Sequence, residues 1–152
     1  MRVLITGANG FIGKNLQLRL SERKDVQVVC FTRNQTPEQL PDLLQGVDFV
    51  FHLAGANRPK DPQDFKAVNA GLTHKLCNAV DTVTRATGKP LPILYTSSIQ
   101  AENDNPYGRS KLEAEITLFS ASLSHLKPAY IFRLPNVFGK WCKPNYNSVV
   151  AT

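Results

Sequence analysis

The sequence predicts an α/β protein built on a doubly wound parallel sheet, with helices on both faces of that sheet. Two observations support this fold class. Short apolar segments alternate along the chain with segments whose apolar residues recur at helical spacing. A glycine-rich segment, residues 7–13, follows the first apolar segment without a break. The 152 residues are enough for one domain with a substantial core, so a single domain over residues 1–152 is expected.

The first half of the chain is predicted to hold three strands and two helices. In order, they are a strand over 3–6, a helix over 11–23, a strand over 26–32, a helix over 37–44 and a strand over 48–53. The strands are largely apolar runs, which are typical of strands covered on both faces. The first helix places Ile12, Leu16 and Leu20 on one face, and the second begins with Pro37, a residue favoured in a first helical turn.

The second half is predicted to hold two longer helices and two more strands. In order, they are a helix over 62–87, a strand over 92–96, a helix that starts at 106 and a strand over 130–134. The apolar stripe of the first helix consists of Phe65, Val68, Leu72, Leu76, Ala79, Val80 and Val83. Asn105 is the expected cap of the second helix. The core stripe expected for that helix consists of Leu112, Ile116, Phe119 and Leu123.

Composition narrows the possible functions. The net charge of +6 is scattered, without a basic run, which argues against a nucleic-acid partner. The basic excess suits either a polyphosphate ligand or merely a basic surface. No apolar run is long enough to span a membrane, and Met1 leads directly into the first strand, so we expect a cytoplasmic protein without a targeting segment. The cysteines form no C-x-x-C pair, so no metal site is expected.

The glycine-rich segment predicts a binding site for a dinucleotide pyrophosphate. A strand, a glycine turn and a helix in this order bring backbone N–H groups and the positive end of the helix dipole to an anion. The residues expected to contact the cofactor here are Gly7, Asn9, Gly10, Phe11, Ile12 and Gly13. Because parallel strands end at one edge of the sheet, the segments that follow the other strands should line the same site.

A second pattern predicts redox chemistry at a carbon that bears oxygen. Tyr107 and Lys111 are four residues apart in a predicted helix, and Ser98 ends the preceding strand. A tyrosine can give or take a hydroxyl proton, and a nearby ammonium should lower its pKa. Ser98 can hold the carbonyl oxygen where charge develops. The alternative is an ordinary surface tyrosine and lysine, which the glycine motif and the serine make less probable.

The second strand end predicts the choice of cofactor. A fold that prefers NAD often carries an acidic residue there, whereas this chain has Thr32 and Arg33. A guanidinium can pair with a 2′-phosphate, and a threonine can donate a hydrogen bond to it. We therefore expect NADP rather than NAD, with a solvated Arg33 as the alternative.

Taken together, these motifs resemble the extended short-chain dehydrogenase/reductase superfamily. The resemblance is carried by the glycines, by 52–55 (HLAG), by 97–98 (SS), by 107–111 (YGRSK) and by 133–139 (RLPNVFG). It implies a Rossmann fold, a catalytic triad of Ser98, Tyr107 and Lys111, and cofactor contacts from Lys111 and the 52–55 segment. The cofactor contacts implied in that segment are Leu53, Ala54 and Gly55.

A narrower resemblance is to bifunctional capsular-polysaccharide enzymes of the CapF/WbjC type. It rests on 54–59 (AGANRP), 98–101, 104–108 and above all 138–148 (FGKWCKPNYNS). It implies an NADPH-dependent reductase of a UDP-4-keto-6-deoxy-N-acetylhexosamine, on the route to UDP-N-acetyl-L-fucosamine. Residues 1–152 would then be a fragment that lacks part of the substrate lobe and a following cupin domain. The residues implied for the UDP-sugar are Asn57, Arg58, Ser98, Asn136, Lys143, Asn145 and Tyr146.

Two alternative functions stay open. An NAD-dependent nucleotide-sugar 4-epimerase can use the same triad, and a non-catalytic NADP-binding scaffold or sensor can use the same fold. Dehydration is disfavoured, because Ile99 and Gln100 stand where related dehydratases carry an Asp-Glu pair. The resemblance also implies a homodimer formed through the helices predicted at 62–87 and 106–123. The Asn69 side chain either hydrogen-bonds to backbone near the catalytic loop or lies on a helix face without a special role. His52 is expected to pack in the core and to form hydrogen bonds.

Overall fold

A computed structural model describes residues 1–59, 61, 63–125 and 128–142. Five parallel strands form one sheet in the order β2-β1-β3-β4-β5. The strands are β1 (Arg2–Thr6), β2 (Gln27–Phe31), β3 (Phe49–His52), β4 (Ile93–Ser98) and β5 (Ala129–Leu134). The α-helices are α1 (Phe11–Ser21), α2 (Leu40–Leu43), α3 (Gln63–Phe65), α4 (Leu72–Thr87) and α5 (Pro106–His125). The predicted fold class and order of elements are confirmed.

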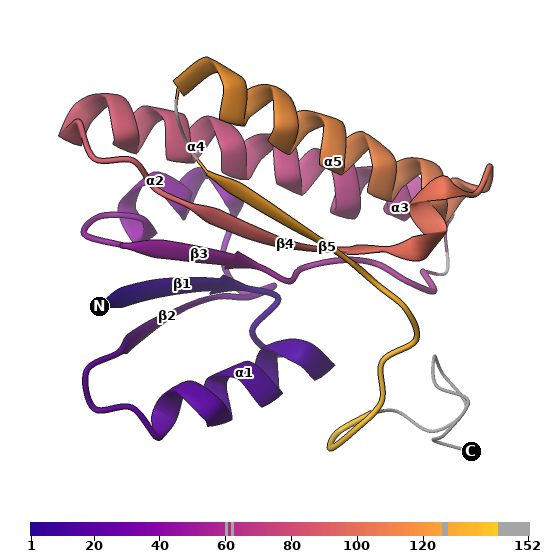
Figure 1. Ribbon diagram of the computed structural model, residues 1–152, viewed down its shortest axis with the longest axis horizontal. Helices are drawn as coiled ribbons and strands as arrows, with labels where there is room; N and C mark the ends of the chain where they lie inside the picture. Colours follow the sequence, from indigo (N-terminus) through magenta and orange to yellow (C-terminus); the bar gives the residue numbers. More distant parts are fainter. Residues whose placement is uncertain (60, 62, 126–127, 143–152) are drawn as a thin grey trace.

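The helices cover both faces of the sheet. Figure 1 shows α1 on one side of the sheet and α2, α4 and α5 on the other. The chain moves from β1 outward to β2, and then across β1 to β3, β4 and β5. Because crossovers between parallel strands are right-handed, this reversal of direction sends α1 to the opposite face from the later helices. It also creates the point, between β1 and β3, where ligands bind in such sheets.

The main core lies between the sheet and the pair α4 and α5. It includes Leu4 and Val50 from the sheet and Leu76 and Val80 from α4, all fully buried. The apolar stripe predicted for the long helix is therefore confirmed in its α4 part. The predicted helix is not α-helical throughout, because a π-helical segment, Lys66–Gly71, joins α3 to α4. A period of 3.6 residues does not reveal a π turn, which adds one residue locally.

The stripe predicted for α5 is wrong. Ile116, Phe119 and Leu123 are 58%, 61% and 70% exposed, and Leu112 is 38% exposed. The buried face of α5 carries other residues, among them Ala114, Leu118 and three polar side chains, Ser110, Lys111 and Glu115. Lys111 lines the cleft described below, whereas Ser110 and Glu115 are bonded to Asn69 and to Ser97 and Arg133. The strongest apolar stripe of this helix therefore points outward. None of the helices in the described ranges is long and apolar enough to cross a membrane.

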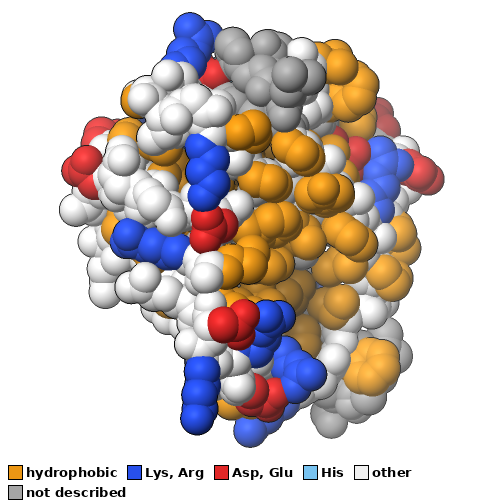
Figure 2. Space-filling model, turned by 60° about the vertical axis from the view of Figure 1, so that its left-hand side comes forward, with side chains coloured by type: hydrophobic (Ala, Val, Ile, Leu, Met, Phe, Trp, Pro, Cys, Tyr) orange, Lys and Arg blue, Asp and Glu red, His pale blue; other side chains and the backbone are white. Residues whose placement is uncertain are grey.

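A second apolar surface is the sheet face on the α1 side, where β3, β4 and β5 lie. The register places Phe51, Leu94 and Tyr130 next to one another on that face, opposite His52 and α4. Phe49 stacks with Tyr130 at 6.3 Å between ring centroids, and Tyr130 is 49% exposed. Figure 2 shows hydrophobic side chains gathered over a broad area on one side of the molecule.

Two short 3-10 segments complete the described structure. Pro37–Gln39 precedes α2, so the helix predicted over 37–44 is a 3-10 turn followed by a single α turn. Thr36 and Gln39 form a capping box at its start. Ile99–Glu102 follows β4 and begins at Ser98, whose hydroxyl accepts a hydrogen bond from the N–H of Gln100 at 3.1 Å. This second segment fixes the strand end that carries the predicted catalytic serine.

Candidate active site

A large cleft runs along the carboxyl edge of the sheet, with a volume of about 1320 Å³. It is lined by the segments that follow all five strands, as expected for a parallel sheet. The predicted site residues that line it are Gly7, Asn9, Gly10, Phe11, Ile12, Gly13, Thr32, Arg33, Leu53, Ala54, Gly55, Asn57, Arg58, Ser98, Tyr107, Lys111 and Asn136. Lys143, Asn145 and Tyr146 lie outside the described residues.

The glycine turn brings the start of α1 against the backbone of the neighbouring strands. Gly7 has a φ of +69°, and a Cβ there would lie 2.7 Å from the backbone N of Ala54. A Cβ on Gly13 would lie 2.4 Å from the Gly7 carbonyl oxygen. No side chain caps the first turn of α1 at Gly10. The N-terminal N–H groups of an 11-residue helix therefore face the cleft without a side-chain acceptor, which suits a bound anion.

The end of β2 carries Thr32 and Arg33 at the cleft margin. Thr32 donates its N–H and its hydroxyl to the side-chain oxygen of Gln35, at 2.8 and 2.7 Å. The hydroxyl predicted to bind a phosphate is therefore engaged within the loop. Arg33 is exposed and lines the cleft, so its guanidinium is the group at this strand end that is available to a 2′-phosphate.

Ser98 and Tyr107 meet across the cleft, as the sequence predicts. The Ser98 side chain interacts with the Tyr107 phenol, and the Tyr107 ring packs against Phe65 at 5.7 Å between centroids. Asn105 caps the helix that carries Tyr107 by accepting the N–H of Gly108 at 2.8 Å. Burial raises the pKa of Tyr107, and the interaction with Ser98 opposes that rise. Tyr107 is therefore protonated at neutral pH.

Lys111 lies on the same helical face as Tyr107 but does not lower its pKa, which differs from the expectation. Its ammonium donates to the hydroxyl of Tyr95 at 3.0 Å and to the carbonyl oxygen of Thr96 at 2.8 Å. Burial lowers the pKa of Lys111 to about 8, and the nearby carboxylate of Glu115 opposes that decrease. The difference arises because β4 supplies buried acceptors for the ammonium.

Asn69 holds the loop after β3 against α5. Its side-chain oxygen accepts the N–H of Ala56 at 2.8 Å, and its NH₂ donates to the carbonyl of Ala56 at 3.1 Å and to Ser110 at 2.9 Å. The structure thus confirms the bond to backbone among the two interpretations of Asn69. A Cβ on Gly55 would lie 3.2 Å from the Asn69 oxygen and 3.5 Å from the Lys111 nitrogen, so Gly55 leaves room for both groups.

Two residues of the site were missed by sequence analysis. The sequence shows Tyr95 only as part of an apolar strand, whereas in the structure it is 1% exposed and contacts Lys111. Glu115 is 8% exposed and accepts hydrogen bonds from Ser97 and from Arg133, the latter at 2.7 to 3.2 Å. Burial alone would raise the pKa of Glu115, but its hydrogen bonds and the charges of Arg133 and Lys111 lower it. Its spacing of four from Lys111 was the available signal.

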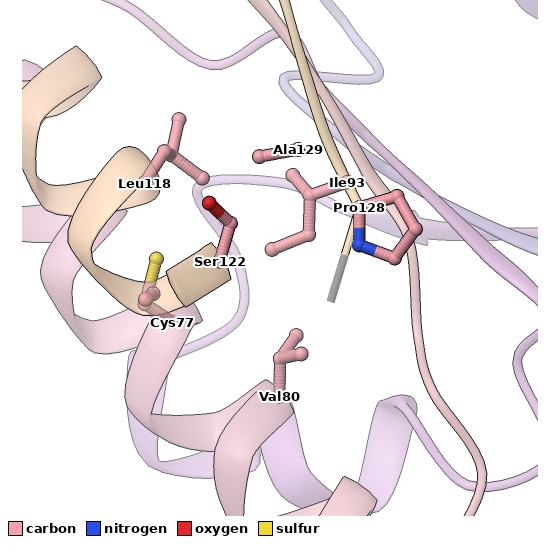
Figure 3. Close-up of a pocket in the computed structure, with 8 residues that line it drawn as sticks. Cys77, Val80, Ile93, Leu118, Ser122, Pro128 and Ala129 are labelled. Carbon is pink, nitrogen blue, oxygen red and sulfur yellow. The ribbon is translucent and has the colours of Figure 1, made fainter. Parts of the chain in front are cut away.

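A second hollow in the described structure is much smaller than the cleft. Figure 3 shows a second hollow between α4, α5 and the sheet, lined by apolar groups such as Val80, Ile93 and Leu118. Its volume of about 10 Å³ is room for one water at most. Within the described part of the chain, no group of three or more His, Cys, Asp or Glu side chains is placed to hold a metal ion.

Comparison with known proteins agrees with this geometry. A family model described as the NAD dependent epimerase/dehydratase family matches residues 3–152. A UDP-2-acetamido-2,6-beta-L-arabino-hexul-4-ose reductase from Pseudomonas aeruginosa is 57% identical over 152 residues, which are 100% of this chain and 40% of the reductase.

Solved structures are similar over nearly the whole chain. The capsular polysaccharide assembling protein CapF from Staphylococcus aureus is 44% identical, with a TM-score of 0.79 over 99% of this chain and 40% of CapF. RMD from Pseudomonas aeruginosa, complexed with NADPH, is 26% identical, with a TM-score of 0.74 over 90% of this chain and 55% of RMD. The chain thus spans about 40% of the length of the two most similar proteins described here.

Proposed function

The chain belongs to the NAD dependent epimerase/dehydratase family, and we propose that it is the cofactor-binding and catalytic part of an NADPH-dependent reductase. The proposed substrate is a UDP-4-keto-6-deoxy-N-acetylhexosamine. The observation that carries the proposal is the convergence of Ser98, Tyr107 and Lys111 on the cleft that the glycine turn opens. The 57% identity to a reductase of a UDP-linked keto sugar supports the substrate class.

The residues of the cleft fit a phosphorylated dinucleotide. The uncapped first turn of α1 offers N–H groups to a pyrophosphate, and Gly7 and Gly13 keep that approach free of side chains. Arg33 offers a positive charge to a 2′-phosphate, with no carboxylate at the positions next to it to repel one. The RMD structure with NADPH supports the same choice of cofactor. When bound, NADPH would supply a hydride to the carbonyl carbon of the sugar.

The side chains then perform the proton chemistry of a ketone reduction. Ser98 donates a hydrogen bond to the carbonyl oxygen and stabilises the negative charge that grows there. Tyr107 gives its phenolic proton to that oxygen, so that a C–H and an O–H bond form and the ketone becomes an alcohol. The raised pKa of Tyr107 suits this direction, because the residue starts each cycle protonated. Lys111 lines the same cleft and offers the positive charge of its ammonium to the bound cofactor while it remains protonated.

We further propose that the active protein is longer than residues 1–152 and is a homodimer. The apolar sheet face at Leu94 and Tyr130 supports the first part, because Tyr130 is half exposed in the described part of the chain, parallel sheets are covered on both faces, and the chain matches 40% of the reductase. The exposed stripe at Ile116, Phe119 and Leu123 supports the second, because apolar stripes of this kind mark contacts. The proposed compartment is the cytoplasm, where a reductase has access to reduced cofactor.

The test uses the full-length protein, NADPH and a UDP-4-keto-6-deoxy-N-acetylhexosamine, with the product identified by NMR. We expect one NADPH to be consumed for each alcohol formed. Tyr107→Phe should lower kcat by about 10²- to 10⁴-fold while NADPH affinity is retained. Wild-type turnover in that variant would contradict the assigned proton donor. Interconversion of two 4-hydroxy sugars without net consumption of cofactor would instead favour the epimerase alternative.

A further inference from the structure

The ammonium of Lys111 donates hydrogen bonds to two acceptors on β4. Its nitrogen lies 3.0 Å from the Tyr95 hydroxyl and 2.8 Å from the Thr96 carbonyl oxygen, and Lys111 also lines the cleft. An ammonium has three N–H groups, so these two bonds leave one N–H for the cleft. We propose that Tyr95 is a positioning residue of the proposed reductase, whose buried hydroxyl keeps Lys111 charged and directs its remaining N–H into the cofactor site.

Packing alone does not require a hydroxyl at position 95. The Tyr95 ring is 1% exposed and lies at 5.2 Å and 27° from the ring of His52. His52 is itself fixed by Thr6 and Thr73, so Tyr95 rests on a rigid surface that a phenylalanine ring would contact equally well. A buried hydroxyl is costly unless it is hydrogen-bonded, and the bond described for this one comes from Lys111. The hydroxyl therefore serves the lysine rather than the core.

The charged and titratable groups around Lys111 come from three elements. Glu115 follows one turn later on α5 and favours the ammonium. His52 on β3 is buried, and the charge of Lys111 disfavours a second positive charge on it. Tyr107 precedes it on α5 and Tyr95 faces it from β4. Burial lowers the pKa of Lys111 to about 8, so the lysine is charged at neutral pH, but its pKa lies only slightly above that pH. Loss of one acceptor would therefore remove charge within the working pH range.

The experiment compares Tyr95→Phe with wild type, both full-length, by two measurements. The first follows the Lys111 signal in protein labelled at the lysine side chains, assigned through Lys111→Met, and gives its pKa by NMR without any turnover. The second is the alkaline limb of the pH profile of kcat/KM. We expect both to move to lower pH by about 1 pH unit, the size of one hydrogen bond to a charged group. Tyr130→Phe is the matched control, because Tyr130 is half exposed on β5, and it should leave both unchanged.

Each outcome decides the inference. An unchanged Lys111 pKa in a folded Tyr95→Phe protein would overturn it, whatever the effect on turnover. A Tyr95→Phe protein that is recovered only unfolded would also overturn it, because a hydroxyl that only positions Lys111 is not needed for folding. The NMR titration separates this inference from the proposed function: a shifted Lys111 pKa in a protein that reduces no keto sugar would uphold the former and reject the latter.

Discussion

The hydroxyl of Thr6 lies 2.7 Å from Nδ1 of His52 and joins the first strand to the third inside the core. On the other side of the ring, Nε2 lies 2.8 Å from the hydroxyl of Thr73, which donates its own hydrogen to the carbonyl of Asn69. Thr73 must therefore accept from Nε2, and Nδ1 must accept from Thr6. This network assigns a neutral imidazole with its proton on Nε2.

The neutral state of His52 makes stability depend on pH. Burial, reinforced by the charge of Lys111, lowers its pKa to about 3, below the usual 6.5. Because the unfolded chain binds the proton more readily, the contribution of His52 is complete above pH 6.5 and is lost as the pH falls toward 3. We expect a loss of about 2 kcal/mol of unfolding free energy between pH 7 and 5.

Urea unfolding of His52→Gln at several pH values checks this expectation. The variant should lose that slope, although it should be less stable than wild type at pH 7. His74→Gln is the control, because His74 is exposed on α4, and it should keep the slope. An equal slope in wild type and His52→Gln would refute the assignment.

The ion pair between Arg133 and Glu115 should stabilise the protein more than a surface pair does. Glu115 is 8% exposed, and Arg133→Met would leave its carboxylate buried with a hydrogen bond from Ser97. We expect a measurable fall in melting temperature, smaller than for a fully buried pair because Arg133 is exposed. Arg109→Met removes the exposed pair with Asp104 and should cost less than about 1 kcal/mol. Similar losses in thermal unfolding for the two variants would contradict this ranking.

Arg33 should determine the preference for NADPH over NADH. Arg33→Ser removes the charge that the cleft offers to a 2′-phosphate, so the Kd of NADPH should rise about tenfold or more, while the Kd of NADH stays constant. Calorimetry of both cofactors measures this directly. Arg19→Ser, at a residue paired with Glu22 on α1, should change neither constant. Loss of affinity for both cofactors alike would assign Arg33 to a site other than the 2′-phosphate.

Gly108 should tolerate no side chain. A Cβ there would lie 2.2 Å from the carbonyl oxygen of Gln100 and 2.4 Å from that of Asn103. Gly108→Ala should therefore destabilise the protein by about 3 kcal/mol and lower turnover, because it separates the Ser98 loop from the helix that carries Tyr107. Gly71→Ala, where the nearest atom is 3.6 Å away, should cost nothing measurable. Equal melting temperatures for the two variants would show that the loop at Gln100 and Asn103 can shift to accommodate the methyl group.

The exposed stripe of α5 should be the contact between two copies. Phe119→Glu places a charge in the middle of that stripe and should shift the full-length protein toward monomer in sedimentation experiments. Thr117→Glu is the control on the same helix, next to rather than within the stripe. A dimer equally stable in both variants would assign the contact to another surface.

The glycine turn, the order of helices and strands along the chain and the segments that line the cleft could be predicted because each follows from local chemistry or from the shared direction of parallel strands. Gly7 needs a positive φ, and strand ends gather at one edge whatever the side chains. The burial of α5 could not be predicted, because its inner face is polar where Ser110, Lys111 and Glu115 meet the site. The role of Tyr95 could not be predicted either, because an aromatic residue in an apolar strand looks the same whether or not its hydroxyl has a partner across the core.

The π turn at Lys66–Gly71 sets the rotational phase between the two ends of a helical rod. Downstream, Leu76 and Val80 are anchored in the core, whereas upstream Phe65 lies against Tyr107. Each residue of an α-helix advances the rotation by about 100°. Deleting one residue from the turn would leave the anchored end in place and swing the Phe65 ring away from the phenol of Tyr107, so the packing of this proposed catalytic group depends on a single extra amino acid in a neighbouring helix.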